Sequence, residues 1–275
     1  AADVTFADGA DIITASAGTS NTRVGVNAGN SIASGGNYNV VVGDEAGTAL
    51  TTGDNNVAIG FEALSTEDAD GNNVAVGYQA LKTLNAGATG GNTAVGYQAG
   101  VDLTTGVQNV LIGYVAGPDL TDADFNVAVG VGSLFNDHKG NKSTAIGHNT
   151  LAIQDFTTST DTFNTAVGFQ AGNAVTTGTN NTFIGGLAGD ATTTGTHNTA
   201  VGFDSLTTNT TASGNSAFGQ SSLKSNTTGT SNTGLGGQAL QTNSTGNSNT
   251  AAGVLALYAN TTGGSNASVG KSSLS

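Results

Sequence analysis

A glycine recurs through the chain at an almost constant spacing, and each copy of it lies in a similar run of residues. With this glycine as an anchor, the sequence contains fifteen copies, and eleven of the fourteen intervals have the same length of seventeen, as from Gly43 to Gly60 and from Gly60 to Gly77. The three other intervals, which follow Gly25, Gly77 and Gly147, are all longer, so every departure is an insertion. The anchors are Gly25, Gly43, Gly60, Gly77, Gly96, Gly113, Gly130, Gly147, Gly168, Gly185, Gly202, Gly219, Gly236, Gly253 and Gly270. A fixed period of this length predicts a repeat protein whose units stack on one another.

Each position around the anchor favours its own residue type, and we number positions from the anchor glycine as zero. Position −1 holds a large apolar residue in fourteen copies, position −3 holds Thr or Val in thirteen, and position −2 is most often Ala. This alternation is typical of a β-strand, and we expect positions −3 and −1 to face inward and the Ala column outward. Position +4 holds only Leu or Gly, and we expect a second strand to begin beside it.

Position −4 holds Asn in fourteen copies, and Ser143 is the exception. In stacked coils these residues would lie directly above one another, where each side-chain amide donates to one neighbour and accepts from the other. We therefore predict a buried structural ladder. Its members are Asn21, Asn39, Asn56, Asn73, Asn92, Asn109, Asn126, Asn164, Asn181, Asn198, Asn215, Asn232, Asn249 and Asn266.

A unit this short, with about two strands, cannot bury its own apolar side, whereas stacked copies can. The sequence thus predicts an all-β protein: a parallel β-solenoid, or β-roll, of about fifteen coils over residues 18–275, with residues 1–17 as an N-terminal cap or joint. A helical repeat is disfavoured because Thr, Val, Asn and Gly are poor helix formers. The outward Ala column predicts an intertwined or side-by-side homotrimer, and a monomer with a solvated Ala face is the alternative.

Two segments show the repeat most clearly, residues 92–100 (NTAVGYQAG) and residues 56–64 (NVAIGFEAL). They resemble the repeats of phage tail fibres and large bacterial surface proteins. They are also similar to the head repeats of trimeric autotransporter adhesins, which form parallel β-rolls assembled as trimers, although the repeat here is longer. The resemblance covers residues from about 18 to 275 and implies an extracellular or virion-surface protein. It further implies host attachment through a cell-surface glycan or protein receptor.

The composition argues against several classes of function. The chain carries 19 acidic and 6 basic residues, a formal net charge of −13, so it would repel a nucleic-acid backbone. No apolar run reaches the roughly 18 residues of a membrane-spanning helix, and we expect no membrane insertion. None of the three His residues lies in a nucleophile motif, and no glycine pattern leads from a strand into a helix. We therefore expect neither an enzyme nor a cofactor site.

Irregular segments carry the remaining candidates for function. Acidic clusters at residues 67–70 and 119–124 offer oxygen atoms to Ca²⁺, but solvated acidic loops are the favoured interpretation. Insertions lengthen the coils at residues 82–91 and 152–163, and the second brings Ile153, Phe156 and Phe163 towards an edge. We predict that these three residues contact a receptor, since loops on rigid scaffolds commonly carry binding. The alternative is that Phe156 and Phe163 cover the widened coil.

The leading hypothesis is a structural or adhesive rod of a phage tail fibre or similar surface appendage. One alternative is a subunit of a self-assembling extracellular filament or a bacterial trimeric adhesin head. A third is an ice-binding solenoid, because the Thr-Thr-Gly corners offer rows of hydroxyl groups. Four Asn-x-Thr sequons, which begin at Asn209, Asn226, Asn243 and Asn260, recur with the period of the anchor glycine, and we interpret them as a further ladder rather than as glycan sites.

Overall fold

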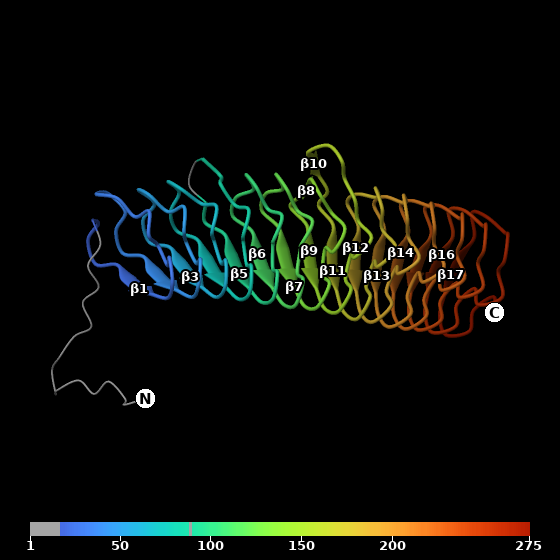
Figure 1. The fold of residues 1–275 in the computed structure, drawn as a ribbon. Helices are drawn as coiled ribbons and strands as arrows, with labels where there is room; N and C mark the ends of the chain where they lie inside the picture. The colour runs from blue at the N-terminus through green and yellow to red at the C-terminus, as the bar shows by residue number, and fades with distance from the viewer. Residues whose placement is uncertain (1–16, 88–89) are drawn as a thin grey trace, which may run out of the picture.

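The structure, a computed structural model, describes residues 17–87 and 90–275, and every regular element within them is a β-strand. The chain winds into a long rod in which each coil lies on the one before it (Figure 1). The predicted cap at residues 1–17 lies outside the described residues except for Ala17. The prediction of an all-β parallel solenoid with seventeen-residue coils is confirmed.

One parallel sheet of fifteen three-residue strands, one strand from each coil, runs along the rod. The strands follow one another in chain order and pair in register, so that Val74 lies beside Thr93 and Val76 beside Val95. The strands are β1 (Thr22–Val24), β2 (Val40–Val42), β3 (Val57–Ile59), β4 (Val74–Val76), β5 (Thr93–Val95), β6 (Val110–Ile112), β7 (Val127–Val129), β9 (Thr144–Ile146), β11 (Thr165–Val167), β12 (Thr182–Ile184), β13 (Thr199–Val201), β14 (Ser216–Phe218), β15 (Thr233–Leu235), β16 (Thr250–Ala252) and β17 (Ala267–Val269). A second, two-stranded parallel sheet joins β8 (Gly140–Asn141) and β10 (Thr160–Asp161).

The strands face the opposite way from our expectation. The Ala residues at position −2 are fully buried inside the coil, including Ala94 and Ala166, whereas Val95 and Ile112 at position −1 are more than a third exposed. The interior is narrow in some coils. At Gly234, which takes the Ala position in its coil, an added Cβ would lie 2.4 Å from the Ser222 hydroxyl oxygen and 3.2 Å from the carbonyl oxygen of Ala239. Ala is the most common residue at position −2, and the larger Val41, Leu111 and Phe183 are also fully buried there, each in a coil whose position +4 is Gly.

The expected second strand is absent from the described coils, because the chain turns at positions +2 and +4. Leu64 and Gly47, both at position +4, have left-handed φ angles of 51° and 52°. Glycine adopts this conformation freely, and a bulky residue adopts it only when the surrounding structure holds it there. Leu64 is fully buried, so core packing holds it. The restriction of this position to Leu or Gly follows from that requirement.

In most coils, either position +4 or position +7 supplies the large apolar side chain that fills the core. Where position +4 is Gly, position +7 supplies the apolar side chain, as in the pair Gly47 and Leu50. Where position +4 is Leu, position +7 is polar in every coil that reaches it except at Leu84. One coil follows neither pattern, and there the buried Phe183 at position −2 fills the interior: an added Cβ at Gly189 would lie 2.4 Å from its ring. The core is therefore a row of large apolar side chains that runs along the rod and is flanked by Ala residues.

The anchor glycine sets the distance between coils. Gly96 has a φ angle of 142°, and an added Cβ would lie 2.1 Å from the carbonyl oxygen of Gly113 in the next coil. Any other residue would both strain the backbone and push the coils apart. This is why the glycine at position zero is the most constant feature of the repeat.

Candidate functional site

The Asn residues at position −4 lie inside the rod and join each coil to the next. The Asn39 Oδ1 accepts the backbone N–H of Asn56 at 2.8 Å, and its Nδ2 donates to the carbonyl oxygen of Gly53, also at 2.8 Å. Both partners belong to the backbone of the following coil. Direct amide-to-amide bonds, such as that from Asn249 to Asn232 at 3.1 Å, supplement this pattern. The ladder therefore ties side chain to backbone more than side chain to side chain.

The ladder changes where the coil is lengthened. Asn73 precedes the insertion at residues 82–91, and its Nδ2 has no hydrogen-bond partner among the described residues. At Ser143 the missing amide is replaced by a buried network. The hydroxyl groups of Ser143 and Thr162 lie 2.6 Å apart, and Gln154 donates to Ser143 and accepts from Asn164, both at 2.9 Å. The insertion after Ser143 thus supplies the Thr162 hydroxyl and the Gln154 amide, which take the place of the missing Asn side chain in the ladder.

The sequons lie in a second ladder at position +7. The Nδ2 of Asn226 donates to the Oδ1 of Asn209 at 3.2 Å and to the carbonyl oxygen of Gly229 at 2.9 Å. Asn243 repeats both bonds with Asn226 and Gly246. The side chains of Asn209, Asn226 and Asn243 are fully buried, so a glycosylating enzyme cannot reach them in the folded rod.

The insertion at residues 152–163 rises from the side of the rod (Figure 1). Its end pairs with the preceding coil through β10 and β8, and Thr157, Thr158 and Ser159 at its tip are exposed. Of the predicted receptor residues, Ile153 is 43% and Phe163 is 52% exposed, whereas Phe156 is only 7% exposed. Phe156 therefore covers the widened coil. We call residues 152–163 the protrusion.

A buried carboxylate holds the base of the protrusion. One oxygen of Asp137 accepts the backbone N–H groups of Gly140 and Phe156, each at 3.1 Å, and the other accepts the side-chain amide of Gln154. Burial raises the pKa of Asp137 above its ordinary value, and these hydrogen bonds oppose the rise. Position +7, where other coils place Leu or Asn, thus anchors this loop through Asp137.

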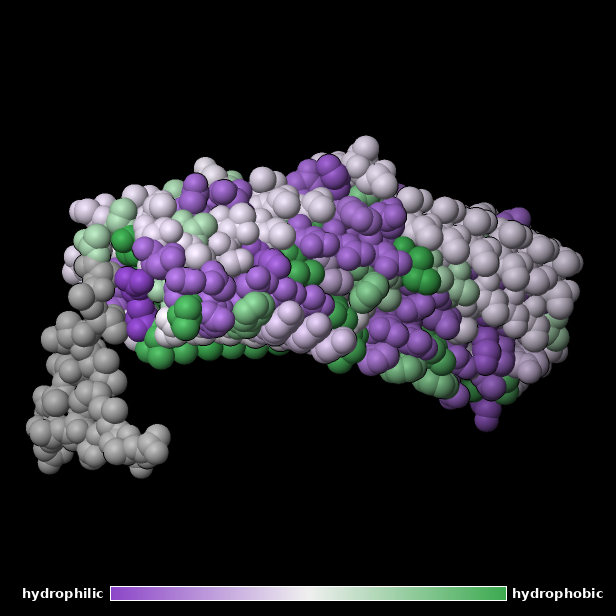
Figure 2. Space-filling model, viewed as in Figure 1, coloured by the Kyte–Doolittle hydropathy of each residue, from purple (hydrophilic) through white to green (hydrophobic). Residues whose placement is uncertain are grey.

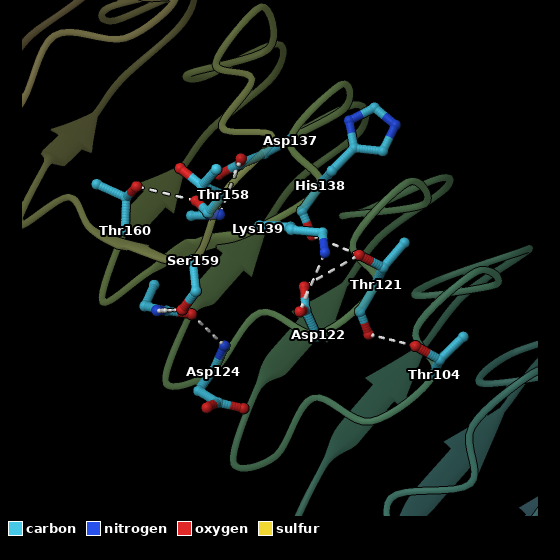
Figure 3. A network of polar contacts seen from close by, with 12 residues as sticks. Thr104, Thr121, Asp122, Asp124, Asp137, His138, Lys139, Thr158, Ser159 and Thr160 are labelled. Atoms are coloured by element: carbon cyan, nitrogen blue, oxygen red, sulfur yellow. Dashed lines mark hydrogen bonds and ion pairs between the residues drawn. The ribbon is translucent and has the colours of Figure 1, made fainter.

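Three ion pairs surround the protrusion. His138 lies 2.9 Å from Asp155, Lys139 3.3 Å from Asp122, and Lys142 2.5 Å from Asp161. The hydrogen bond to Asp155 raises the pKa of His138. Figure 3 shows Lys139 reaching Asp122, with Ser159 and Asp124 in the same network. The Lys142 ammonium group also lies 5.2 Å from the centre of the Phe163 ring. Of the six paired residues, Asp122 belongs to the acidic cluster at residues 119–124, and Asp155 and Asp161 belong to the protrusion, two segments that the sequence pattern indicates.

In both acidic clusters, carboxylate groups form hydrogen bonds or ion pairs with groups of the protein. Asp122 pairs with Lys139, and Asp124 accepts the backbone N–H of Val107 at 2.8 Å. Glu67 and Asp70 are buried rather than solvated, and Glu67 accepts the backbone N–H of Asp70 at 2.9 Å. Burial raises the pKa of Glu67. Within residues 17–87 and 90–275 no group of three or more acidic, His or Cys residues is placed to hold a metal ion.

Apolar side chains form the most extensive surface feature of the rod. Positions −3 and −1 of the main sheet point outward, and beside them Phe61, Tyr78, Tyr97 and Tyr114 stack at position +1 with ring centres 5.1 to 5.4 Å apart. Figure 2 shows a row of apolar residues along the left part of the lower edge of the rod, with hydrophilic residues over the left and middle of its front. We call the outward residues at positions −3 and −1 of the fifteen strands the strand face.

Hydroxyl groups occur on two sides of the coil, and their hydrogen bonding differs between the two sides. At the Thr-Thr-Gly corners, the first Thr donates to a carbonyl oxygen of the next coil, as Thr104 does to Thr121 at 3.0 Å and Thr193 to Thr210 at 3.1 Å. On the strand face, by contrast, the hydroxyls of Thr182 and Thr199 make no hydrogen bond within the described chain.

Comparison of this chain with protein-family models, curated proteins and solved structures gave no match. No helix long and apolar enough to cross a membrane occurs in the part of the chain that the structure describes. The arguments for function therefore rest on the rod, the protrusion and the strand face.

Proposed function

We propose that this chain is the non-catalytic shaft of an extracellular or virion-surface appendage, such as a phage tail fibre or an adhesin. The observation that carries the proposal is the continuity of the in-register sheet through all fifteen coils, together with an Asn ladder present in fourteen of them. Each coil is bonded to the next by backbone ladders and by buried amides, so the unit resists bending along its length. A stiff rod suits the task of holding a contact away from a surface.

The protrusion is the part of the shaft best suited to contact a receptor. A repeated frame presents nearly the same surface in every coil, and selective binding needs something that is not repeated. Ile153, Phe163 and the hydroxyls of Thr157, Thr158 and Ser159 are exposed together with the ion pairs around them. Apolar groups, hydroxyls and paired charges are the chemistry that binds a cell-surface glycan or a protein loop.

The experiment replaces the exposed residues by those that other coils carry at the same positions. Ile153→Ala matches Ala174 and Ala191, and Phe163→Asn matches Asn180. We expect the double variant to keep the melting temperature of the parent and to lose attachment to an array of bacterial lipopolysaccharides and capsular glycans and to intact cells. The matched control is Phe125→Asn, at the same position as Phe163 but two coils away. Undiminished attachment by a folded double variant would overturn the role of the protrusion.

A second candidate is ice binding, because the strand face carries a row of hydroxyls. Position −3 holds Thr or Ser in seven consecutive coils, at residues 144, 165, 182, 199, 216, 233 and 250. These hydroxyls make no hydrogen bond within the described chain and lie on a regular sheet. In the first half, Val at the same position interrupts the row, which ranks this candidate second. A thermal-hysteresis measurement on the monodisperse protein tests it directly.

A further inference from the structure

The strand face carries no charged residue along the whole rod. Position −1 is Val, Ile, Leu, Phe or Ala in every coil, and position −3 is Val, Ala, Thr or Ser. The chain carries 19 acidic and 6 basic residues, so their complete absence from two outward columns is a property of this face and not of the surface in general. Charges are depleted in this way at the centre of protein interfaces.

The strand face is also kept free of interruption. The three longer intervals, which follow Gly25, Gly77 and Gly147, insert residues without disturbing the pairing of the main sheet. Thr165 of β11 still lies directly beside Thr144 of β9, although the longest insertion separates them. Insertions therefore emerge on other sides of the coil, and this side remains able to meet a long, regular partner.

The size of the face suits a stable interface. Fifteen strands at the usual strand spacing of about 4.8 Å span roughly 67 Å, and two outward columns with their side chains are roughly 10 Å wide. The resulting area of roughly 700 Å² approaches the roughly 800 Å² that each partner buries in a standard complex. Parallel sheets are, moreover, nearly always covered on both faces.

We propose that the strand face is covered by the strand faces of further copies of this chain. This proposal concerns how the proposed shaft is assembled, and it replaces the Ala column as the contact surface, because Ala94 and its equivalents are buried inside a single chain. Another copy offers an uncharged surface of matching length and spacing, with apolar residues at position −1 throughout. Covering the face also removes the hydroxyl row of the second half from water.

The absence of Cys from the sequence allows a sharp test by single-cysteine crosslinking. Thr144 lies on β9, the eighth strand of the fifteen, so copies that meet in register bring this residue close to its equivalent in either orientation. We expect Thr144→Cys to form interchain disulfides under mild oxidation in full-length protein. Thr194→Cys, an exposed position at a Thr-Thr-Gly corner, is the control and is expected to stay uncrosslinked.

Sedimentation velocity supplies the second measurement. The parent is expected to be oligomeric, and Ile146→Lys combined with Val167→Asp is expected to be monomeric with an unchanged circular dichroism spectrum, since both side chains face solvent in a single chain. A monomeric parent, or equal crosslinking of Thr144→Cys and Thr194→Cys, would overturn the proposal. Should the charged variant misfold, the crosslinking pair still decides. Loss of glycan attachment leaves these readouts unchanged, so the two proposals fail separately.

Discussion

The two halves of the rod build one fold from different chemistry. Residues 1–137 contain 15 acidic and two basic residues, a net charge of −13, whereas residues 138–275 contain four of each and are neutral. In the first half, position −3 is mainly Val and position +1 carries the stacked rings from Phe61 to Tyr114. In the second half, position −3 is mainly Thr and position +7 carries the second Asn ladder. The backbone pairing is the same throughout.

The comparison shows which features the coil requires and which it tolerates. The anchor glycine, the inner Asn and the small residue at position −2 recur in both halves, and they set the stacking distance and the interior width. Position +7 is an aliphatic or acidic residue in the first half and is Asn in four consecutive coils of the second half, from Asn209 to Asn260. No interval between the anchors of these four coils departs from the common length, but the intervals from Gly96 to Gly147 are equally regular without Asn at position +7. The second buried ladder therefore requires regular coils, since a stacked amide requires its neighbour at the same place in the next coil, whereas regular coils do not require the ladder.

The largest expected effect tests the core-filling rule that both halves share. Phe183→Ala removes a fully buried ring from a coil that has Gly189 and Thr192 where other coils place a large apolar residue. We expect a loss of about 3 to 5 kcal/mol in the free energy of unfolding, measured by urea denaturation.

Adding Gly189→Leu to that variant sharpens the test. Leu occupies this position in other coils at φ angles near that of Gly189, which is 59°. The double variant should recover most of the lost stability, whereas Gly189→Leu alone should destabilise the protein by overpacking against Phe183. A double variant less stable than Phe183→Ala would show that the two positions do not share one space.

The next largest effect is expected from replacing an Asn of the position −4 ladder, once in a regular coil and once beside an insertion. Asn181→Leu leaves the N–H of Asn198 and the carbonyl oxygen of Gly195 without their partners, at about 1 to 3 kcal/mol for each buried group. Asn73→Leu frees chiefly the N–H of Asn92, because the Nδ2 of Asn73 donates to no acceptor among the described residues. We expect the first variant to lower the unfolding free energy about twice as much as the second. Equal losses would mean that Nδ2 bonds add nothing to the ladder.

The sequence contains enough information to predict which side of each strand faces the interior, and our prediction of that side was wrong. Period-two alternation places positions −4 and −2 on the same side, so an inward Asn at −4 requires an inward Ala at −2. We instead treated large residues as inward because apolar residues are usually buried. The side of the strand that holds the inner Asn, rather than the hydrophobicity of each column, decides which residues lie inside, so Ala94 is buried and Val95 is not.

The burial of Phe156 in the protrusion could not be predicted from the sequence. The protrusion's length and position follow from the period, but the burial of Phe156 depends on the amide of Gln154 and the carboxylate of Asp137, which meet only after the coil has closed. The exposed Phe163 belongs to position −5, where Asn55 and Phe125 also take left-handed φ angles. Its exposure thus follows from the frame and not from the insertion.

The charge difference between the halves predicts a pH dependence that lies mostly in the first half and its junction. The hydrogen bond with Lys82 lowers the pKa of Glu62, which opposes the other shifts. Burial raises the pKa values of Glu67, Asp119 and Asp137 and, in the second half, that of Asp190, and Asp155 raises the pKa of His138. The five groups with raised values favour the protonated form when folded. Their contribution is therefore fully present below their ordinary pKa values and is lost as pH rises through the raised values. We expect the melting temperature to decrease as the pH is raised from about 5 to about 8.

Glu67→Gln isolates one of these groups. The remaining oxygen still accepts the N–H groups of Asp68 and Asp70, while the buried charge and its repulsion with Asp70 are removed. The variant should melt higher than the parent at about pH 8, and this difference should shrink as the pH falls and the carboxyl group gains its proton. A parent whose melting temperature rises with pH over this range would contradict the assignment of raised pKa values.

The smallest effect concerns the stacked rings, which only the first half carries as a continuous row. Tyr97 lies between Tyr78 and Tyr114, with ring centres 5.2 and 5.1 Å away, and it is 41% exposed. Aromatic pairs contribute about 0.5 to 1.5 kcal/mol beyond their buried area, and exposure reduces the area term, so we expect Tyr97→Ser to cost about 1 kcal/mol in chemical denaturation. Gln220→Ser, at the same position in the second half, is the control, and it should change stability by less than about 0.5 kcal/mol because Gln220 stacks on no ring among the described residues. Equal changes at the two positions would mean that the rings add nothing to the stacking of coils, and that the two halves differ there in surface chemistry alone.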